Sequence, residues 1–174
     1  MKTFNQLFLE AANSNKTIDF EYFKALDDNE EKARELVDEY AKSKGYNVVA
    51  WHGTPVGAFD KFKLSKSFGS VYFFAKTKEY AKYYANRFSG SPNPTVMELY
   101  LRITNPLKVE RFEPEGVKTA YNIRKQGYDA VETPNAFIVF LPDQIKLSDL
   151  KTYKNNKIIP LSKRFNIDSD LMSH

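Results

Sequence analysis

The sequence of 174 residues contains no cysteine and only two histidines, His52 and His174. Disulfides, thiol nucleophiles and most structural zinc sites need cysteine thiolates, so this composition excludes them. With so few histidines we also expect no metal site. No apolar run approaches the roughly 20 residues of a membrane span, and no secretory h-region is visible, which predicts a soluble protein that acts in a cytoplasm and does not bind membranes.

Aromatic residues are abundant, because 14 Phe, 11 Tyr and 1 Trp make up 15% of the chain. Such side chains build cores, and they also stack on flat ligands such as nucleobases and pyridine rings. The net charge of +4 permits an acidic or nucleic-acid partner without requiring one. The glycine-rich phosphate loops of mononucleotide and dinucleotide folds are missing, and so is a serine-hydrolase set.

Residues 1–45 form an N-terminal region with helical patterns. One helical stripe of about two turns begins the chain, at Phe4, Leu7 and Phe8. The polar stretch 12–17 predicts a break or linker. A second helix is predicted by caps at 27–29, by a stop at Gly45, and by apolar residues at helical spacing, namely Ala33, Leu36, Val37, Tyr40 and Ala41.

Beyond Gly45 the pattern changes to short strands, which we expect at Asn47–Trp51, Val71–Ala75, Val96–Ile103, Tyr128–Glu132 and Ala136–Leu141. Two short helices are predicted between them, at Thr77–Phe88 and at about Gly116–Gln126. The fold class is therefore α+β, with the strands in a domain of residues 46–150. Residues 151–174 form a basic tail that is partly docked at best, with positive charges at Lys151, Lys154, Lys157, Lys163 and Arg164.

Three features of this domain could carry chemistry. His52 lies where the first strand ends, and Gly53 beside it would let a ligand approach the backbone. Tyr72 should point opposite to its strand neighbours. Tyr83 lies off the core stripe of its helix, which we place at Tyr80, Ala81, Tyr84, Ala85 and Phe88. Each residue alone is compatible with a purely structural role.

Taken together, the ordered blocks WHGT, GSVYFF and EYAKYYA resemble the ADP-ribosyltransferase fold of the poly(ADP-ribose) polymerase and diphtheria-toxin branch. The later blocks VMELYLRITNPL, KQGYDAVE, NAFIVFLPDQIKL and KIIPLSKRFN look like the small ADP-ribosyltransferase domains of phage and mobile-element polyvalent proteins. The resemblance spans roughly residues 46–168. It implies a split core of two packed, mostly antiparallel sheets, and NAD+ as substrate.

The resemblance also implies roles for individual residues. His52 would bind the ribose hydroxyls of NAD+, and the backbone of Gly53, with Thr54 beside it, would hold the nicotinamide amide. Tyr72 and Tyr83 would sandwich the nicotinamide ring. Tyr80 stands where the polymerases have a small serine that grips the carboxamide, and Gln144 matches a glutamine of structural rather than catalytic role.

The third signature position departs from the family, because Ala136 stands where its members have the catalytic glutamate. A carboxylate there stabilises the cation formed when the nicotinamide–ribose bond breaks, and losing such a group costs on the order of 10²–10³ in rate. Three explanations stay open. Ala136 could be an engineered replacement, a natural loss in an inactive homologue, or a change for which Glu132 substitutes.

The first residues, MKTFNQLFLEA, resemble the capsid-targeting leader of internal proteins of contractile-tailed phages. That resemblance implies cleavage after Glu10, and residence in the phage virion and then in the host cytoplasm. An amphipathic helix packed on the domain is the alternative.

The sequence therefore predicts a monomeric mono-ADP-ribosyltransferase that modifies a host protein or nucleic acid. An NAD+ glycohydrolase and an inactive module that binds NAD+ or ADP-ribose are the alternatives.

Overall fold

The computed structural model describes residues 4–59, 62, 71–87, 92–114 and 118–165. The chain divides into two compact units, one from its two ends, up to residue 44 and from 148, and one from residues 45–147. The helices are α1 (Phe4–Asp28), α2 (Glu30–Ser43), α3 (Lys78–Asn86), α4 (Thr119–Lys125) and α5 (Leu161–Arg164), with a 3₁₀ turn at Pro142–Gln144. The strands are β1 (Val48–Thr54), β2 (Tyr72–Ala75), β3 (Thr95–Leu101), β4 (Pro106–Lys108), β5 (Ala130–Glu132), β6 (Ala136–Val139), β7 (Ile145–Leu147), β8 (Tyr153–Lys154) and β9 (Lys157–Ile158).

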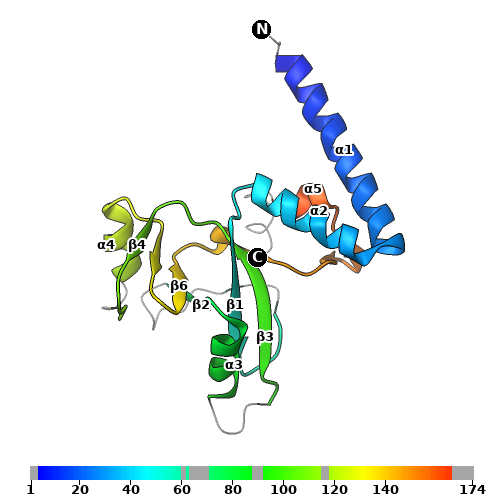
Figure 1. Cartoon of the computed structure of the whole chain (residues 1–174). Coiled ribbons are helices and arrows are strands. Elements are labelled where there is room, and N and C mark those ends of the chain that lie inside the picture. The colour runs from blue at the N-terminus through cyan, green and yellow to red at the C-terminus, as the bar shows by residue number, and fades with distance from the viewer. Residues whose placement is uncertain (1–3, 60–61, 63–70, 88–91, 115–117, 166–174) are drawn as a thin grey trace. The chain divides into compact units, whose positions relative to one another are not determined.

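The break predicted at residues 12–17 is wrong, because α1 runs through them without interruption (Figure 1). The stretch contains no proline or glycine, and one of its polar side chains bonds within the helix. Thr17 Oγ1 donates to the carbonyl of Asn13 at 3.0 Å. Polarity alone therefore does not end this helix.

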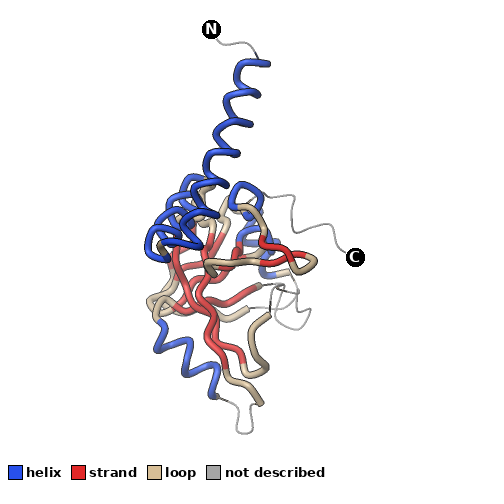
Figure 2. Tube along the Cα trace, turned by 90° about the vertical axis from the view of Figure 1, so that its right-hand side faces the viewer, coloured by secondary structure: helices blue, strands red, loops and turns tan. Residues whose placement is uncertain are grey.

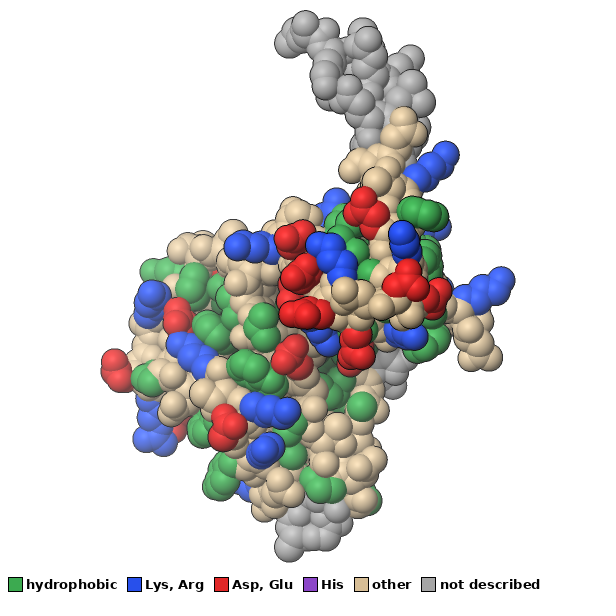
Figure 3. Space-filling view, turned by 45° about the vertical axis from the view of Figure 1, so that its right-hand side comes forward, with side chains coloured by type: hydrophobic (Ala, Val, Ile, Leu, Met, Phe, Trp, Pro, Cys, Tyr) green, Lys and Arg blue, Asp and Glu red, His purple; other side chains and the backbone are tan. Residues whose placement is uncertain are grey.

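The helix predicted after residue 27 is confirmed in α2. Asn29 caps it, since its side chain accepts a hydrogen bond from the backbone N–H of Lys32 at 2.9 Å. Gly45 follows its last turn with φ 85°, a conformation that glycine adopts without strain. The exposed side of α2 is acidic, and acidic side chains gather in a row in the space-filling view (Figure 3); those of α2 are Glu30, Glu31, Glu35, Asp38 and Glu39.

Residues 151–165 are more ordered than their composition suggests. A hairpin of β8 and β9 turns through Asn155 and Asn156, which both have positive φ. Leu161 is fully buried, and the backbone N–H and the hydroxyl of Ser162 donate to the carboxylate of Asp19 at 2.7 and 2.6 Å. Arg164 is itself buried and donates to backbone carbonyls, so it does not belong to a solvated basic surface.

Seven strands of the other unit form one sheet, in the order β4-β5-β6-β2-β1-β3-β7. Strands are the red segments in Figure 2. All neighbouring pairs are antiparallel except β4 and β5. The unit therefore has the α+β class that the sequence predicts. β1 pairs with β3 from end to end, whereas among the described residues it pairs with β2 only where Trp51 lies opposite Ala75. The half of the sheet with β2 and the half with β1 therefore separate beyond that pair.

The two faces of the sheet carry different clusters of buried side chains. The first cluster joins both halves of the sheet and includes Ala50, Leu99, Phe74 and Val139. The second lies under α4 and includes Ala120, Ile123, Val131 and Ile138. Because successive side chains of a strand alternate between faces, this division sorts every strand residue of the site to one side or the other.

Candidate active site

His52 lies inside β1, which continues for two more residues to Thr54. The prediction that the strand ends at His52 is therefore wrong. Its partner across the sheet is Met97, which places the ring on the face of the first cluster. His52 Nδ1 lies 3.1 Å from the carbonyl oxygen of Phe73. A carbonyl only accepts, so Nδ1 carries the proton and Nε2 of the neutral ring is left as an acceptor.

The surroundings of His52 keep it neutral. Burial lowers its pKa, and this outweighs the opposing effect of the hydrogen bond to Phe73. Three aromatic rings surround the imidazole, with centroids 5.7, 5.2 and 5.7 Å away, and these belong to Phe59, Phe62 and Phe74. At neutral pH the ring therefore offers an unprotonated nitrogen, suited to accept a hydrogen bond from a ligand hydroxyl.

Tyr72 lies on the same face, with its ring centroid 5.9 Å from that of Phe62. Its side chain is 7% exposed, and its hydroxyl has no hydrogen-bond partner among the described residues. Burial raises the pKa of this hydroxyl to about 12. A buried donor without a partner costs about 1–3 kcal/mol, which a ligand that bonds to it would recover.

Gly53 faces the other side of β1, where α3 packs. A Cβ on Gly53 would lie 1.9 Å from the carbonyl oxygen of Ala81, so only glycine allows the helix this close. The missing side chain therefore makes room for α3 on that face. The hydroxyl of Thr54, a buried residue, accepts a hydrogen bond from the backbone N–H of Val56 at 3.4 Å.

The tyrosines of α3 lie on the exposed side of that helix. Thr77 caps it, accepting from the backbone N–H of Tyr80 at 3.2 Å. Tyr83 is 62% exposed, in keeping with its position off the core stripe. Tyr84, predicted to belong to that stripe, is 40% exposed, and its hydroxyl lies 3.3 Å from that of Tyr80. The buried stripe consists of the small residues Ala81 and Ala85, because the close approach of β1 leaves no room for rings.

Tyr72 and Tyr83 do not meet in this structure. Phe73 and Ala75 share the face of Trp51 and Gly53, and thus of α3, whereas Tyr72 points to the other face. A flat ligand held between the two tyrosines would have to lie where β1 and β2 part.

Ala136 opens β6 and lies opposite Ala75 of β2. Its methyl group packs on the second cluster, with Ile138, on the face away from Tyr72. Its backbone is tied into a turn, since its N–H donates to Thr133 Oγ1 at 3.0 Å. The position that matches the family glutamate thus faces away from the hydroxyl of Tyr72.

Glu132 ends β5 and lies opposite Phe137 of β6. The ammonium group of Lys76 is 2.7 Å from Glu132 Oε1 and 4.7 Å from the centroid of the Phe137 ring, and that of Lys108 is 3.9 Å from Glu132 Oε2. The hydrogen bond from Lys76 is the main reason that the pKa of Glu132 is lowered. Glu132 is therefore an ionised carboxylate at neutral pH.

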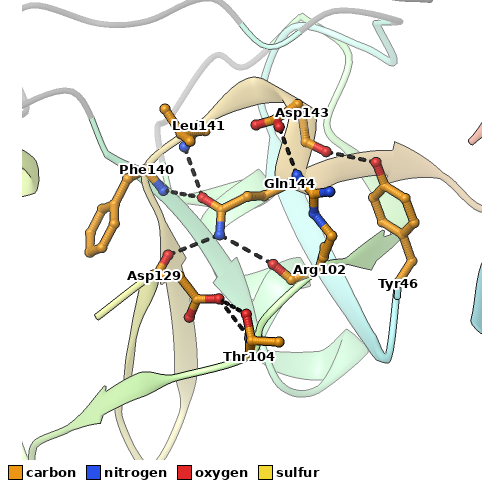
Figure 4. Close-up of polar contacts among 8 residues, drawn as sticks. All are labelled: Tyr46, Arg102, Thr104, Asp129, Phe140, Leu141, Asp143 and Gln144. Atoms are coloured by element: carbon orange, nitrogen blue, oxygen red, sulfur yellow. Dashed lines mark hydrogen bonds and ion pairs between the residues drawn. The ribbon is translucent and has the colours of Figure 1, made fainter. Parts of the chain in front are cut away.

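Gln144 is part of the scaffold (Figure 4). Its side-chain oxygen accepts from the backbone N–H groups of Phe140 and Leu141, both at 3.0 Å. Its side-chain nitrogen donates to the carbonyls of Arg102 and Asp129, at 3.2 and 2.9 Å. The amide joins three segments of the sheet unit and has no bonding capacity left for a ligand.

Sequence reasoning did not find Phe59, Phe62 or Lys76. The two phenylalanines follow β1 in a segment without periodicity. Only their ring contacts mark them, those of both with His52 and that of Phe62 with Tyr72. Glu10 falls within α1, and its side chain lies outside the described part of the chain. No helix among the described residues combines the length and the apolar character needed to cross a bilayer.

No curated protein and no solved structure matches the chain. One family model does match, over residues 42–125, and its description is ADP-Ribosyltransferase in polyvalent proteins. The match covers β1, β2 and α3, and thus His52, Tyr72 and Tyr83. The match supports an ADP-ribosyltransferase domain of the polyvalent-protein type in this region of the chain.

Proposed function

We propose that the chain binds NAD+ and transfers its ADP-ribose to a protein or nucleic acid of a host cell. The observation that carries the proposal is the arrangement of His52 and Tyr72 on one face of the sheet. Both rings contact Phe62, one offers a free acceptor nitrogen, and the other a buried hydroxyl without a partner among the described residues. A nucleotide with ribose hydroxyls and polar ring substituents can satisfy both groups.

The residues present would divide the work as follows. His52 Nε2 would accept a hydrogen bond from a ribose hydroxyl. The backbone of Gly53 and Thr54 would hold the carboxamide where β1 and β2 part. Tyr72 and Tyr83 would flank the nicotinamide, with Tyr80 beside it on α3. No metal ion takes part in this scheme.

Transfer breaks the bond between C1′ of the ribose and the nicotinamide nitrogen. The electron pair leaves with nicotinamide, which becomes neutral, and positive charge develops on the ribose. An acceptor oxygen or nitrogen forms the new bond to C1′ and loses its proton. If water takes this place the protein is an NAD+ glycohydrolase, and the two outcomes differ in whether labelled ADP-ribose ends on a macromolecule or free in solution.

Calorimetric titration with NAD+ tests the proposal directly. We expect the unaltered chain to bind, and His52→Ala to weaken binding about tenfold or more, as expected for a lost hydrogen bond in a buried site. His174→Ala is the matched control because it removes the other histidine and should leave binding unchanged. Absence of binding by the unaltered chain would contradict the proposal.

An NAD+-binding module without turnover is the second candidate, because Ala136 provides no carboxylate. Its signature is binding without release of nicotinamide. The Ala136→Glu variant distinguishes the loss of a parental glutamate from its substitution by Glu132. Nicotinamide release that appears only in the variant would indicate that a parental glutamate was lost there, whether by engineering or in evolution.

The N-terminal resemblance extends the proposal to a phage protein packaged in the virion and delivered at infection. Cleavage after Glu10 would leave Ala11 as the first residue. The intact mass of the protein isolated from virions measures this directly. A mass that includes residues 1–10 would contradict cleavage at Glu10.

A further inference from the structure

The open question in the site is which carboxylate stabilises the charge on the ribose. Ala136 has none, and the pairing of strands shows which carboxylates can take its place. Tyr72 lies opposite Val139, and Phe74 lies opposite Phe137, so these side chains share one face. Phe137 in turn lies opposite Glu132. Glu132 therefore shares the face of Tyr72, whereas position 136 does not.

Contacts confirm that Glu132 faces this side. Lys76 follows β2, and its backbone N–H donates to the carbonyl of Asn135, which continues the register of β2 and β6 by one pair. The Lys76 side chain crosses the ring of Phe137 to reach Glu132. Lys76 is two residues beyond Phe74, so its side chain lies on the same face, about 7 Å farther along the strand direction. The ring of Phe74 in turn contacts His52.

The carboxylate is held in place and remains accessible. The side chains of Lys76 and Glu132 are 25% and 24% exposed, so their ion pair is partly shielded from water and geometrically fixed. Lys108 approaches the second oxygen from β4 with a side chain that is 77% exposed, which leaves that oxygen only weakly engaged. One oxygen is thus anchored and the other is available.

We infer that Glu132 is the catalytic carboxylate of this transferase and that Lys76 is its positioning residue. The inference rests on the proposed function. As the C1′–nitrogen bond breaks, the ionised Glu132 offsets the positive charge on the ribose, and its weakly engaged Oε2 accepts a hydrogen bond from a ribose hydroxyl. Glu132 stays ionised throughout, nicotinamide takes the bonding pair, and the acceptor releases its proton to solvent.

Nicotinamide release by the unaltered chain and by Glu132→Gln tests this assignment. The glutamine keeps the shape and removes the charge, so kcat should fall about 10²–10³-fold, as for the loss of other preorganised groups that stabilise a transition state. The dissociation constant for NAD+ should stay within about threefold. Glu110→Gln is the matched control, because this exposed carboxylate lies just beyond β4 and its loss should leave kcat unchanged.

The positioning role of Lys76 has its own readout. Lys76→Met keeps the stem over Phe137 but removes the cation, and should lower kcat at least about tenfold with little change in KM. Lys76→Arg keeps the charge and should restore most of kcat. Equal kcat in the methionine and arginine variants would overturn the positioning role.

Ala136→Glu in the Glu132→Gln background completes the test. The inference predicts no recovery of turnover, because the new carboxylate would face the second cluster. Recovery there would overturn the assignment, and so would a Glu132→Gln variant as active as the unaltered chain. An unaltered chain that binds NAD+ without releasing nicotinamide would overturn the inference alone, whereas absence of NAD+ binding would overturn the proposed function as well.

Discussion

Gln144 and Tyr72 are both buried polar side chains of the sheet unit, and they are satisfied in opposite ways. Gln144 makes four hydrogen bonds to backbone groups and is 4% exposed. Tyr72 is 7% exposed, and its hydroxyl has no partner among the described residues. A polar group that the fold satisfies completely acts as a structural joint. A polar group that the fold buries without a partner marks where a ligand can bind.

The largest effect on the free energy of unfolding should come from removing the hydrogen bonds of Gln144. Gln144→Ala leaves two buried N–H groups and two carbonyls without their partner, and at about 1–3 kcal/mol for each buried donor the free energy of unfolding should fall by about 3–5 kcal/mol. Urea denaturation measures it. Gln126→Ala is the control, because among the described residues its side chain bonds only to the exposed carbonyl of Asn122 in α4, and it should change stability by less than about 0.5 kcal/mol. A small effect of Gln144→Ala would mean that the fold does not depend on the hydrogen bonds of this side chain.

A somewhat smaller loss is expected for Gly53→Ala. The new methyl group would collide with the backbone of α3, and overpacking of this kind costs about 3 kcal/mol. Gly127→Ala separates collision from backbone strain, since it meets no atom within 4 Å but has φ 92°, and about 1–2 kcal/mol is expected there. Thermal unfolding of both variants ranks them. Equal losses would show that α3 moves aside for the methyl group.

The sequence predicts the scaffold better than it predicts the site. Caps at Asn29 and Thr77 are local, so they can be read from a few neighbouring residues. Which face of the sheet Ala136 and Glu132 point to depends on the register of β5, β6 and β2, and no local sequence pattern reveals that register. Ala81 and Ala85 are buried as predicted, but the exposure of Tyr84 was not predicted, because tyrosine fits the helical pattern equally well until β1 is placed beside the helix.

Protonation of His52 should produce a smaller, pH-dependent effect. Burial lowers the pKa of His52 in the folded state below the usual value of about 6.5, so its contribution to stability is present above that pH and is lost as the pH falls below it. Glu132 also has a lowered pKa, but its window lies below about 4.5. Urea denaturation between pH 7.5 and 5.5 therefore isolates His52. His52→Gln should flatten the profile and His174→Gln should not, and a profile that His52→Gln leaves unchanged would contradict burial of the imidazole.

Tyr72→Phe should give the smallest change in stability, and it tests most directly whether Tyr72 differs from Gln144 in serving a ligand and not the fold. Removing a hydroxyl that has no partner among the described residues should leave the free energy of unfolding unchanged or raise it by up to about 1 kcal/mol, because the phenylalanine ring avoids the desolvation cost. Binding of NAD+ should weaken about five- to tenfold, since the ligand loses one hydrogen bond worth about 1 kcal/mol. Calorimetry and urea denaturation on the same sample measure both quantities. Loss of more than about 1 kcal/mol of stability would show that the hydroxyl has a protein partner after all, and that Tyr72 belongs with Gln144 in the scaffold.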